Sequence, residues 1–328
     1  MLSLLTSEIL YMNTTIQESE MSRVAIVGGA GRVGVSFAFH LLSENICKQI
    51  VLLDVFDDQV QGERLDLMHA SSCLGNTRFI AGTNPELLVG AQVIVIPAGA
   101  RRKPDQSRLD LIRTNVGIID YWMDKIQVYN PYAVVLIVVN PVDVLTYRAY
   151  CVGGQHRHRI FGLGNVMDVV RFQSIMAERF NWNPLFVDAY LLGEHGDAMV
   201  PIWSQASYAG LYLKDMKNID DELLKQVYME TRSAGAEVIR LKGGAGWAVG
   251  VAITEVVRSV IRDEKRVLCV SSVPDGAYGI EGNVALSLPT IIGRNGVEGY
   301  VDVKLSDVEM EGLNHAAEVL RDTYSQVA

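Results

Sequence analysis

The chain has 328 residues, of which 49% are hydrophobic and 20% are charged, and its formal net charge is −9. This composition excludes the disordered and fibrous classes and is typical of a globular protein with two sub-domains. The negative charge argues against a nucleic-acid partner, and no apolar run reaches the roughly 18 residues that cross a membrane. Neither a metal site nor a disulfide pattern is suggested by the spacing of Cys47, Cys73, Cys151 and Cys269, so we expect a cytoplasmic protein without metal.

The first 20 residues differ from the rest because they contain no Lys or Arg. Their apolar start, residues 1–5, is too short for a signal sequence and lacks a basic flank. We interpret residues 1–20 as an N-terminal extension. Two alternatives remain, an unanchored arm ahead of Met21 or an arm that packs on a neighbouring subunit, and the first is favoured because termini are seldom ordered unless tied down.

A glycine-rich turn separates the apolar run at residues 24–27 from the helical stretch at 35–44. The order strand, glycine turn, helix is typical of dinucleotide-binding proteins, because backbone N–H groups and a helix N-terminus can then contact a pyrophosphate. The pattern is weak by itself. We predict that the cofactor contacts Gly28, Gly29, Gly31, Arg32, Val33 and Gly34.

A second apolar strand, residues 50–53, ends at Asp54, which lies 20 residues after Gly34. A carboxylate at this point would accept hydrogen bonds from the adenosine ribose and repel a 2'-phosphate, so the sequence favours NAD over NADP. The alternative is that Asp54 merely caps its strand beside a tight turn.

Further apolar runs at residues 93–97 and 133–139 flank an amphipathic stretch at 109–128. Alternating strands and helices predict an α/β protein with a Rossmann-type, doubly wound parallel sheet. Ligands bind beyond the carboxyl ends of such strands. Two segments fall there, the loop at 98–108, which carries four cations, and the polar residues Asn140 and Asp143. An ordinary solvated loop is the alternative for the cations.

The second half of the chain predicts an α+β substrate domain. Helical periodicity runs over residues 220–241 and 245–262, and short strands separated by turn residues follow within 267–289. Ser306 ahead of Glu309 fits a capping box that opens a terminal helix at 306–324. We therefore expect a dinucleotide-binding domain at 21–164 and a substrate and catalytic domain at 165–328.

His195 lies between two glycines, directly after the apolar run 186–192. This placement predicts that His195 follows the end of a buried strand, at a point where the backbone can pass close to a ligand. An imidazole, with an ordinary pKa of about 6.5, can act as base in one direction and acid in the other. From this segment alone, a structural histidine remains the alternative.

From about Arg23 onward the chain resembles the NAD-dependent lactate and malate dehydrogenases. The likeness is carried by the glycine turn and by five further motifs, at residues 61–67, 98–111, 140–143, 168–171 and 193–197. The resemblance implies that His195 donates and accepts the proton, that Asp168 pairs with it, and that Arg171 clamps the substrate carboxylate. It also implies that Arg108, on a mobile loop, polarises the carbonyl, that Asn140 contacts substrate and cofactor, and that cofactor contacts include Ala98, Gly99, Asn115 and Val138.

The resemblance also bears on the substrate. Arg102 stands where malate dehydrogenases carry arginine and lactate dehydrogenases glutamine, and Ala245 stands where lactate enzymes commonly carry threonine. Both positions predict the substrate pair oxaloacetate and (S)-malate, so we expect a lactate-dehydrogenase-like malate dehydrogenase. An L-lactate dehydrogenase is the alternative, and a nucleotide-binding sensor without turnover is a third. A surface pair at i,i+3 is the alternative for Asp168 and Arg171.

The same resemblance allows expectations about regulation and about the oligomeric state. Gln173 and Asp188 replace the basic residue and histidine of enzymes activated by fructose 1,6-bisphosphate, so we expect no such site. The basic stretch 155–159 is interpreted as a solvated loop, with anion binding as the alternative. Since dimers and tetramers occur in the family, we expect a homotetramer, and a dimer is the alternative.

Overall fold

The computed structural model describes residues 22–100, 108–217 and 219–327. The N-terminal extension and most of the cationic loop, Arg102 included, therefore lie outside the described residues.

Six parallel strands form the first half of the main sheet, in the order β3-β2-β1-β4-β5-β6. Chain order reverses between β1 and β4, which makes this the switch point of a doubly wound sheet. β4 and β5 are buried along their whole length, as expected where helices cover both faces. The predicted Rossmann-type sheet is confirmed. Its strands are β1 (Arg23–Val27), β2 (Gln49–Leu53), β3 (Arg78–Gly82), β4 (Val93–Ile96), β5 (Val134–Ile137) and β6 (Ile160–Gly162).

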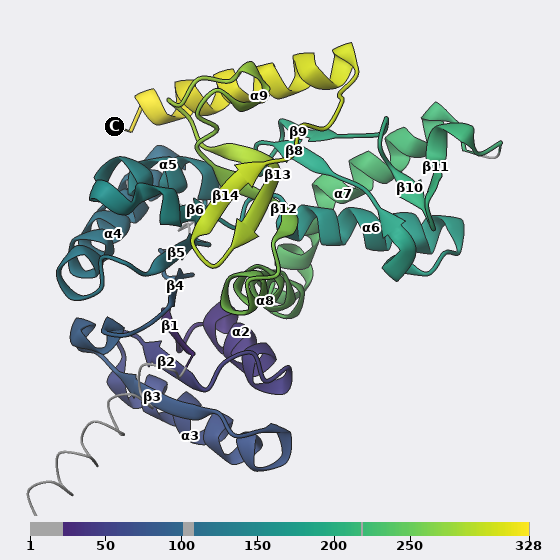
Figure 1. Ribbon diagram of the computed structural model, residues 1–328. Coiled ribbons are helices and arrows are strands. Elements are labelled where there is room, and N and C mark those ends of the chain that lie inside the picture. Colours follow the sequence, from purple (N-terminus) through teal and green to yellow (C-terminus); the bar gives the residue numbers. More distant parts are fainter. Residues whose placement is uncertain (1–21, 101–107, 218, 328) are drawn as a thin grey trace, which may run out of the picture.

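Helices cover the two faces of this sheet (Figure 1). One hydrophobic cluster joins the sheet to α2 and α8, and another joins it to α4 and α5. α2 begins at Arg32, three residues before the stretch predicted from periodicity, so the glycine turn leads straight into its first turn. The helices of this half are α2 (Arg32–Ser43), α3 (Asp57–Leu74), α4 (Arg108–Tyr129) and α5 (Val142–Val152), with a short 3-10 turn η1 (Pro85–Leu88).

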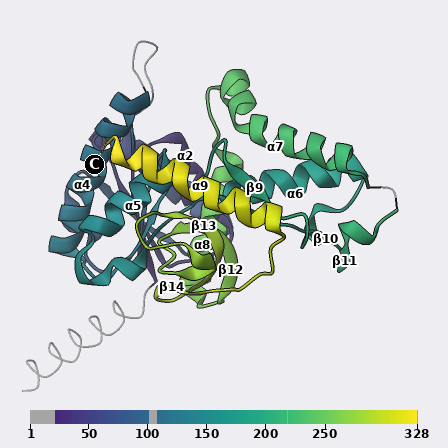
Figure 2. The ribbon, with the colours of Figure 1, turned by 90° about the horizontal axis from the view of Figure 1, so that it is seen from above.

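The second half continues the same sheet with antiparallel strands. β12 pairs with β6 through Ser271 and Gly162, and the order continues β12-β13-β8-β9, with β14 beside β13. Helices α6, α7 and α9 surround this part (Figures 1 and 2). The elements are β8 (Leu191–Gly193), β9 (Met199–Pro201), β12 (Arg266–Ser272), β13 (Leu286–Gly293), β14 (Gly296–Tyr300), α6 (Val166–Phe180), α7 (Asp221–Lys242), α8 (Trp247–Arg262) and α9 (Asp307–Ser325).

The apolar run at 186–192 is not one strand, contrary to our prediction. Val187 and Asp188 form β7 in a separate three-stranded sheet with β10 (Ser207–Tyr208) and β11 (Leu211–Tyr212), whereas Leu191 begins β8 of the main sheet. Hydrophobicity reports burial but not which sheet a strand joins. Short 3-10 turns occupy Gly154–Arg159 (η2), Pro184–Phe186 (η3), Leu213–Asp215 (η4) and Ala277–Gly279 (η5). η2 covers the basic stretch at 155–159 and is broken by a kink at His156.

The capping box of α9 is confirmed. Ser306 Oγ accepts a hydrogen bond from the N–H of Glu309, and the Glu309 carboxylate accepts one from the N–H of Ser306. The same carboxylate accepts bonds from the N–H and hydroxyl of Ser204, at 2.9 and 2.7 Å. The cap therefore also fastens α9 to the segment that follows β9.

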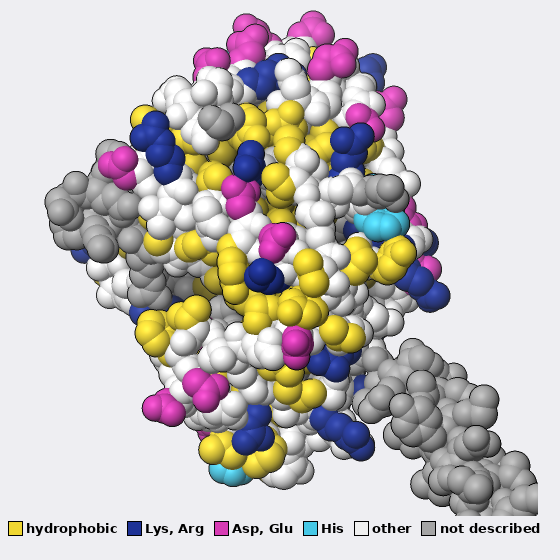
Figure 3. Space-filling view, turned by 90° about the vertical axis from the view of Figure 1, so that its left-hand side faces the viewer, with side chains coloured by type: hydrophobic (Ala, Val, Ile, Leu, Met, Phe, Trp, Pro, Cys, Tyr) yellow, Lys and Arg dark blue, Asp and Glu magenta, His cyan; other side chains and the backbone are white. Residues whose placement is uncertain are grey.

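The surface over α4 and α5 mixes acidic and basic side chains around a central group of hydrophobic ones (Figure 3). Within the described residues, no helix is long and apolar enough to cross a membrane.

Candidate active site

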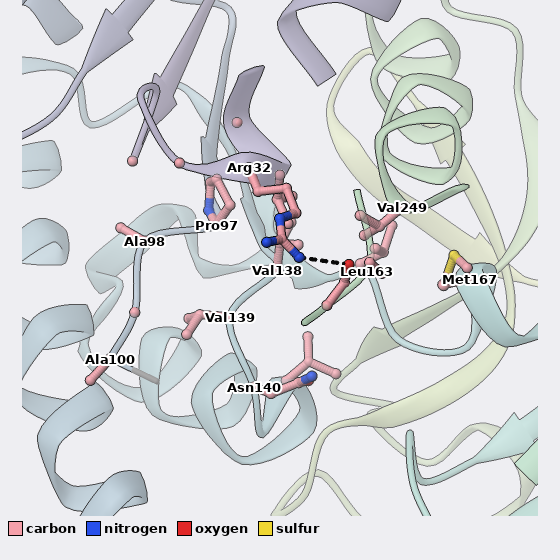
Figure 4. A pocket seen from close by; sticks show the side chains of 18 of the residues that line it. Arg32, Pro97, Ala98, Ala100, Val138, Val139, Asn140, Leu163, Met167 and Val249 are labelled. Atoms are coloured by element: carbon pink, nitrogen blue, oxygen red, sulfur yellow. Dashed lines mark hydrogen bonds between the residues drawn. The ribbon is translucent and has the colours of Figure 1, made fainter. Parts of the chain in front are cut away.

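A cavity of about 1400 Å³ opens at the carboxyl ends of the parallel strands, at the switch point of the sheet. Its walls come from both halves of the chain: the glycine turn, the segments after β2, β4 and β5, the start of α6, and the turn between α7 and α8 (Figure 4). Pockets that bind one small ligand usually have volumes of roughly 300–1,000 Å³. The cavity therefore has room for a dinucleotide and a small substrate together.

The glycine turn forms a cradle that side chains would fill. Gly28 has φ +92°, a conformation that favours glycine, and a Cβ at Gly34 would lie 2.3 Å from the Gly28 carbonyl oxygen. A Cβ at Gly29 would lie 2.8 Å from Leu52, so this glycine lets the turn pack on β2. The N-cap of α2 is Gly31, which provides no side-chain cap. The helix N–H groups are thus left to an anionic group, and the cradle fits a pyrophosphate.

Asp54 lies at the cavity wall, where it holds the glycine turn. Its carboxylate accepts hydrogen bonds from the N–H of Ala30 (3.0 Å) and of Val55 (2.8 Å). These contacts match the strand-capping alternative, and the position in the cavity wall matches the cofactor interpretation. The strand-capping role and a cofactor contact are therefore compatible in Asp54.

Arg32 lines the cavity, but its guanidinium crosses to the second half of the chain (Figure 4). It donates hydrogen bonds to the carbonyl oxygens of Lys242 (3.2 Å) and Gly244 (2.9 Å). These contacts were not anticipated from the glycine motif, in which only the backbone is expected to face the cofactor.

The segments after β4 and β5 bring Ala98, Gly99, Val138 and Asn140, the predicted cofactor contacts, into the cavity wall. Asn115, from α4, is buried behind this wall. Its Oδ1 accepts a bond from the N–H of Ala100 (2.8 Å), and its Nδ2 donates to the carbonyl of Asn140 (2.9 Å). Asn115 thus joins the two segments.

His195, Asp168 and Arg171 meet at the substrate end of the cavity. Asp168 stands in the first turn of α6 with 1% of its side chain exposed, and its carboxylate contacts Nδ1 of His195 and accepts a bond from Nη1 of Arg171 at 2.8 Å. The pair of Asp168 and Arg171 exists, but it is not a surface pair. A buried carboxylate between two cations is typical of a site that orients an acid-base group.

The electrostatics of this group favour a charged pair. Burial acts to lower the pKa of His195, but the charge of Asp168 and its hydrogen bond outweigh burial and raise this pKa above its ordinary value. Burial acts to raise the pKa of Asp168, but His195 and Arg171 outweigh it and hold the pKa below its usual range. The imidazolium is therefore stabilised near neutral pH.

Two residues near His195 were given no role from the sequence. Asp143, in the first turn of α5, is buried and accepts a bond from the backbone N–H of His195 at 2.7 Å, and burial raises its pKa to about 6. Its place three residues after Asn140, at the same end of the sheet, was a usable signal. Arg232, on α7, lines the cavity and pairs with Asp197 at 2.9 Å. No sequence motif marked it.

Of the remaining predicted residues, one lines the cavity and two have side chains outside the described part of the structure. Ala245 lines the cavity in the turn between α7 and α8. Arg102 lies outside the described residues, and of Arg108 the structure gives only its place as the first residue of α4. Among the residues that are described, no cluster of His, Cys, Asp and Glu has the arrangement of a metal site.

Comparisons with known proteins cover both halves of the chain. Residues 22–162 match the lactate/malate dehydrogenase NAD-binding domain, and residues 166–328 match the alpha/beta C-terminal domain of the same family.

Relatives of similar length match nearly the whole chain. The L-lactate dehydrogenase of Moorella thermoacetica is 37% identical, with 94% of this chain and 98% of the relative covered. The L-lactate dehydrogenase B chain of Sceloporus woodi is 35% identical, with 91% of each covered. A solved structure described as a lactate dehydrogenase from a deep-sea metagenome library superposes with a TM-score of 0.89 at 30% identity, covering 93% of this chain and 98% of that one.

Proposed function

The chain belongs to the lactate/malate dehydrogenase family and is an NAD-dependent dehydrogenase of 2-hydroxy acids, and on that premise we propose that it interconverts pyruvate and L-lactate. The observation that carries the proposal is the set of His195, Asp168 and Arg171 in one cavity with the glycine cradle, in a chain whose relatives are named L-lactate dehydrogenases.

The prediction of a malate dehydrogenase is wrong. It depended on Arg102 and Ala245, whereas the relatives that match over nine tenths of the chain are named lactate dehydrogenases. Of those two positions, Arg102 lies outside the described residues. The alternative, an L-lactate dehydrogenase, is the better supported reading.

His195 would move the proton. Its Nδ1 contacts Asp168, which leaves Nε2 to face a substrate. A reduced nicotinamide cofactor held at the glycine cradle would supply the hydride that reduces the carbonyl carbon. His195 would donate the proton from Nε2 to the carbonyl oxygen, and in oxidation of lactate it would take that proton back. Asp168 would stabilise the imidazolium in both directions.

Arg171 would bind the substrate carboxylate. It lines the cavity one turn after Asp168, and a Cβ at the facing Gly235 would lie 3.4 Å from its Nη1. A guanidinium offers parallel donors that match a carboxylate. We propose the remaining substrate contacts at Asn140, Ala245 and, through its expected reach from α4, Arg108.

NAD would lie along the glycine cradle. Gly28, Gly31, Val33 and Gly34 line the cavity at the start of α2, and Ala98, Gly99, Val138 and Asn140 line it at the ends of β4 and β5. Asp54 at the end of β2 would meet the adenosine ribose. Gly29 and Asn115 would act by packing and by holding the walls, as their contacts indicate.

A sensor without turnover is disfavoured by these residues. A binding module has no need of an imidazole held by a buried carboxylate beside an arginine, because those groups serve proton transfer and substrate orientation.

The test is an NADH-oxidation assay with pyruvate and oxaloacetate side by side, together with an NADH-binding titration. We expect turnover with pyruvate and a higher kcat/KM for it than for oxaloacetate. Binding of NADH without turnover of either acid would support the sensor, and a preference for oxaloacetate would overturn the lactate assignment.

We also propose that the chain assembles into a homotetramer in the cytoplasm and that its two domains divide near Asn165. The first part of this proposal is supported by apolar side chains exposed on the three-stranded sheet, which are considered below.

A further inference from the structure

The turn between α7 and α8 forms part of the cavity wall but carries almost no side chains. Three of its four residues are glycines, and Gly243 and Gly244 have φ of +75° and +133°. Ala245 is the member that presents a side chain to the cavity. A turn of this composition has little rigidity of its own, since glycine restricts the backbone least.

Two side chains of α2 hold this turn by its carbonyl groups. Arg32 donates to the carbonyls of Lys242 and Gly244, and the buried Ser36 donates from Oγ to the carbonyl of Gly246 at 2.9 Å. The three acceptors alternate along the chain, so Ala245 lies between two fixed carbonyl groups. Figure 4 shows Arg32 reaching across the cavity, with its bond to the turn dashed.

Arg32 supplies donors to carbonyl groups at and just after the end of α7. The carbonyls at the end of α7 have no partner within the helix, and they lie at the negative end of its dipole, where a guanidinium is favourable. The Gly246 carbonyl also accepts the first helical bond of α8, from Gly250 at 2.9 Å. Ser36 therefore fixes the point from which α8 starts.

The packing is built around the two donors. A Cβ at Gly250 would lie 2.5 Å from Ser36 Oγ, and a Cβ at Gly246 would lie 3.2 Å from Cγ of Arg32. Both glycines thus let the second half of the chain approach α2 closely enough for these bonds.

We propose that Ser36 and Arg32 are positioning residues for the substrate: from the helix that receives the cofactor, they hold the turn at 243–246 so that Ala245 keeps its place in the substrate wall. This inference rests on the proposed function, because it assigns that wall to the 2-oxo acid. The same two turns of α2 thus form the cofactor cradle and brace the substrate side of the cavity.

The test compares Ser36→Ala with Ser43→Ala. Both substitutions remove one hydroxyl from α2, but Ser43 is exposed and bonds only to His40 of its own helix. For Ser36→Ala we expect the KM of the 2-oxo acid to rise about five- to tenfold, the effect of one lost buried hydrogen bond, with kcat and the Kd of NADH within about twofold of the unmodified enzyme. Ser43→Ala should leave all three unchanged.

A second measurement tests the positioning role through binding alone. Oxamate, an amide isostere of pyruvate, is titrated into the NADH complex, and Ser36→Ala should weaken its binding by the same factor as the KM. Arg32→Met, which keeps the aliphatic stem over Gly246 and removes the donors, should also raise the KM, and it provides the test if Ser36→Ala does not fold.

The outcomes separate this inference from the proposed function. The KM is measured for whichever 2-oxo acid the unmodified enzyme reduces best, so a preference for an acid other than pyruvate affects only the proposed function. An unchanged KM in a folded Ser36→Ala, or a fall in melting temperature with no change in KM, would overturn the positioning role.

Discussion

His195 is held by two contacts, one to its ring and one to its backbone, and by the strand that precedes it. Asp168 of α6 binds its ring, Asp143 of α5 binds its backbone N–H, and β8 delivers it to the cavity. Such fixation on rigid elements is what a proton-transfer group requires. The first prediction follows from it.

We expect His195→Asn to lower kcat for pyruvate reduction by at least about a hundredfold, because a general acid commonly contributes that much. NADH affinity should change little, since the glycine cradle is at the other end of the cavity. Steady-state kinetics and an NADH titration measure the two effects.

The control is His315→Asn, because His315 is an exposed histidine on α9. It should retain the activity of the unmodified enzyme. Near-normal turnover in His195→Asn would remove this residue from the mechanism.

The pH dependence provides the second prediction. Reduction needs protonated His195, whose pKa lies above its ordinary value of about 6.5 because Asp168 outweighs the effect of burial. The kcat/KM for pyruvate should therefore fall as the pH rises through this raised pKa, and that for lactate should rise over the same range. In Asp168→Asn the charge is lost, so both midpoints should move to lower pH.

Profiles of kcat/KM against pH, measured for pyruvate reduction and for lactate oxidation, test these trends. A midpoint that stays in place in Asp168→Asn would mean that the carboxylate does not set the pKa of His195. The effect of Asp168 on the free energy of unfolding depends on acid instead. Because its pKa is lowered in the folded protein, the carboxylate stabilises the fold, and this stabilisation is lost only as the pH falls through that lowered pKa.

At the scale of elements, local patterns predicted what local forces determine. The helix predicted at 306–324 matches α9 to within one residue at each end, and the capping box at Ser306 and Glu309 is present. By contrast, the split of the run at 186–192 depends on which strands lie nearby, and no local pattern carries that information.

The glycine turn yields the third prediction. In Gly34→Ala the new Cβ would lie 2.3 Å from the Gly28 carbonyl, a backbone atom that cannot move aside without shifting the cradle. We expect the Kd of NADH to rise at least about tenfold, in line with a loss of more than roughly 1.4 kcal/mol, and the melting temperature to fall.

Gly62→Ala is the matched control. Gly62 lies within α3 with nothing within 4 Å of the added Cβ, so the substitution should leave NADH binding unchanged and raise stability slightly, as alanine favours helix by roughly 0.5–1 kcal/mol. Equal effects of the two substitutions on NADH binding would show that the cradle tolerates a side chain.

At the scale of the whole molecule, the motifs indicated most of the candidate site residues and the pairing of Asp168 with His195, but not the other contacts that hold the site. The backbone of His195 is held by a carboxylate 52 residues away, and the substrate wall is held by a serine 210 residues away. These partners become neighbours only when the antiparallel strands of the second half extend the parallel sheet at β6. Contacts between residues this far apart in the sequence therefore could not be predicted from local patterns.

The exposed apolar side chains argue for assembly. On the small three-stranded sheet and the turn before it, four large residues are 44–86% exposed: Leu185, Phe186, Leu211 and Tyr212. β11 is an edge strand of that sheet, which lies at the end of the molecule away from α4 and α5 (Figure 2). An apolar patch beside an open edge favours association, because a second copy of the chain removes both from water.

The last prediction is therefore that the chain is a homotetramer that uses this sheet as one of its contacts. Light scattering should give about four times the chain mass of 36.1 kDa. The double substitution Leu185→Glu and Leu211→Glu should lower that mass, because charge buried at an interface without a partner is costly. Val308→Glu changes an equally exposed apolar residue at the start of α9, where an acidic side chain suits the helix dipole, and should leave the mass unchanged. A monomeric unmodified chain would contradict the assembly, and a tetramer that survives the double substitution would place its contacts on another face.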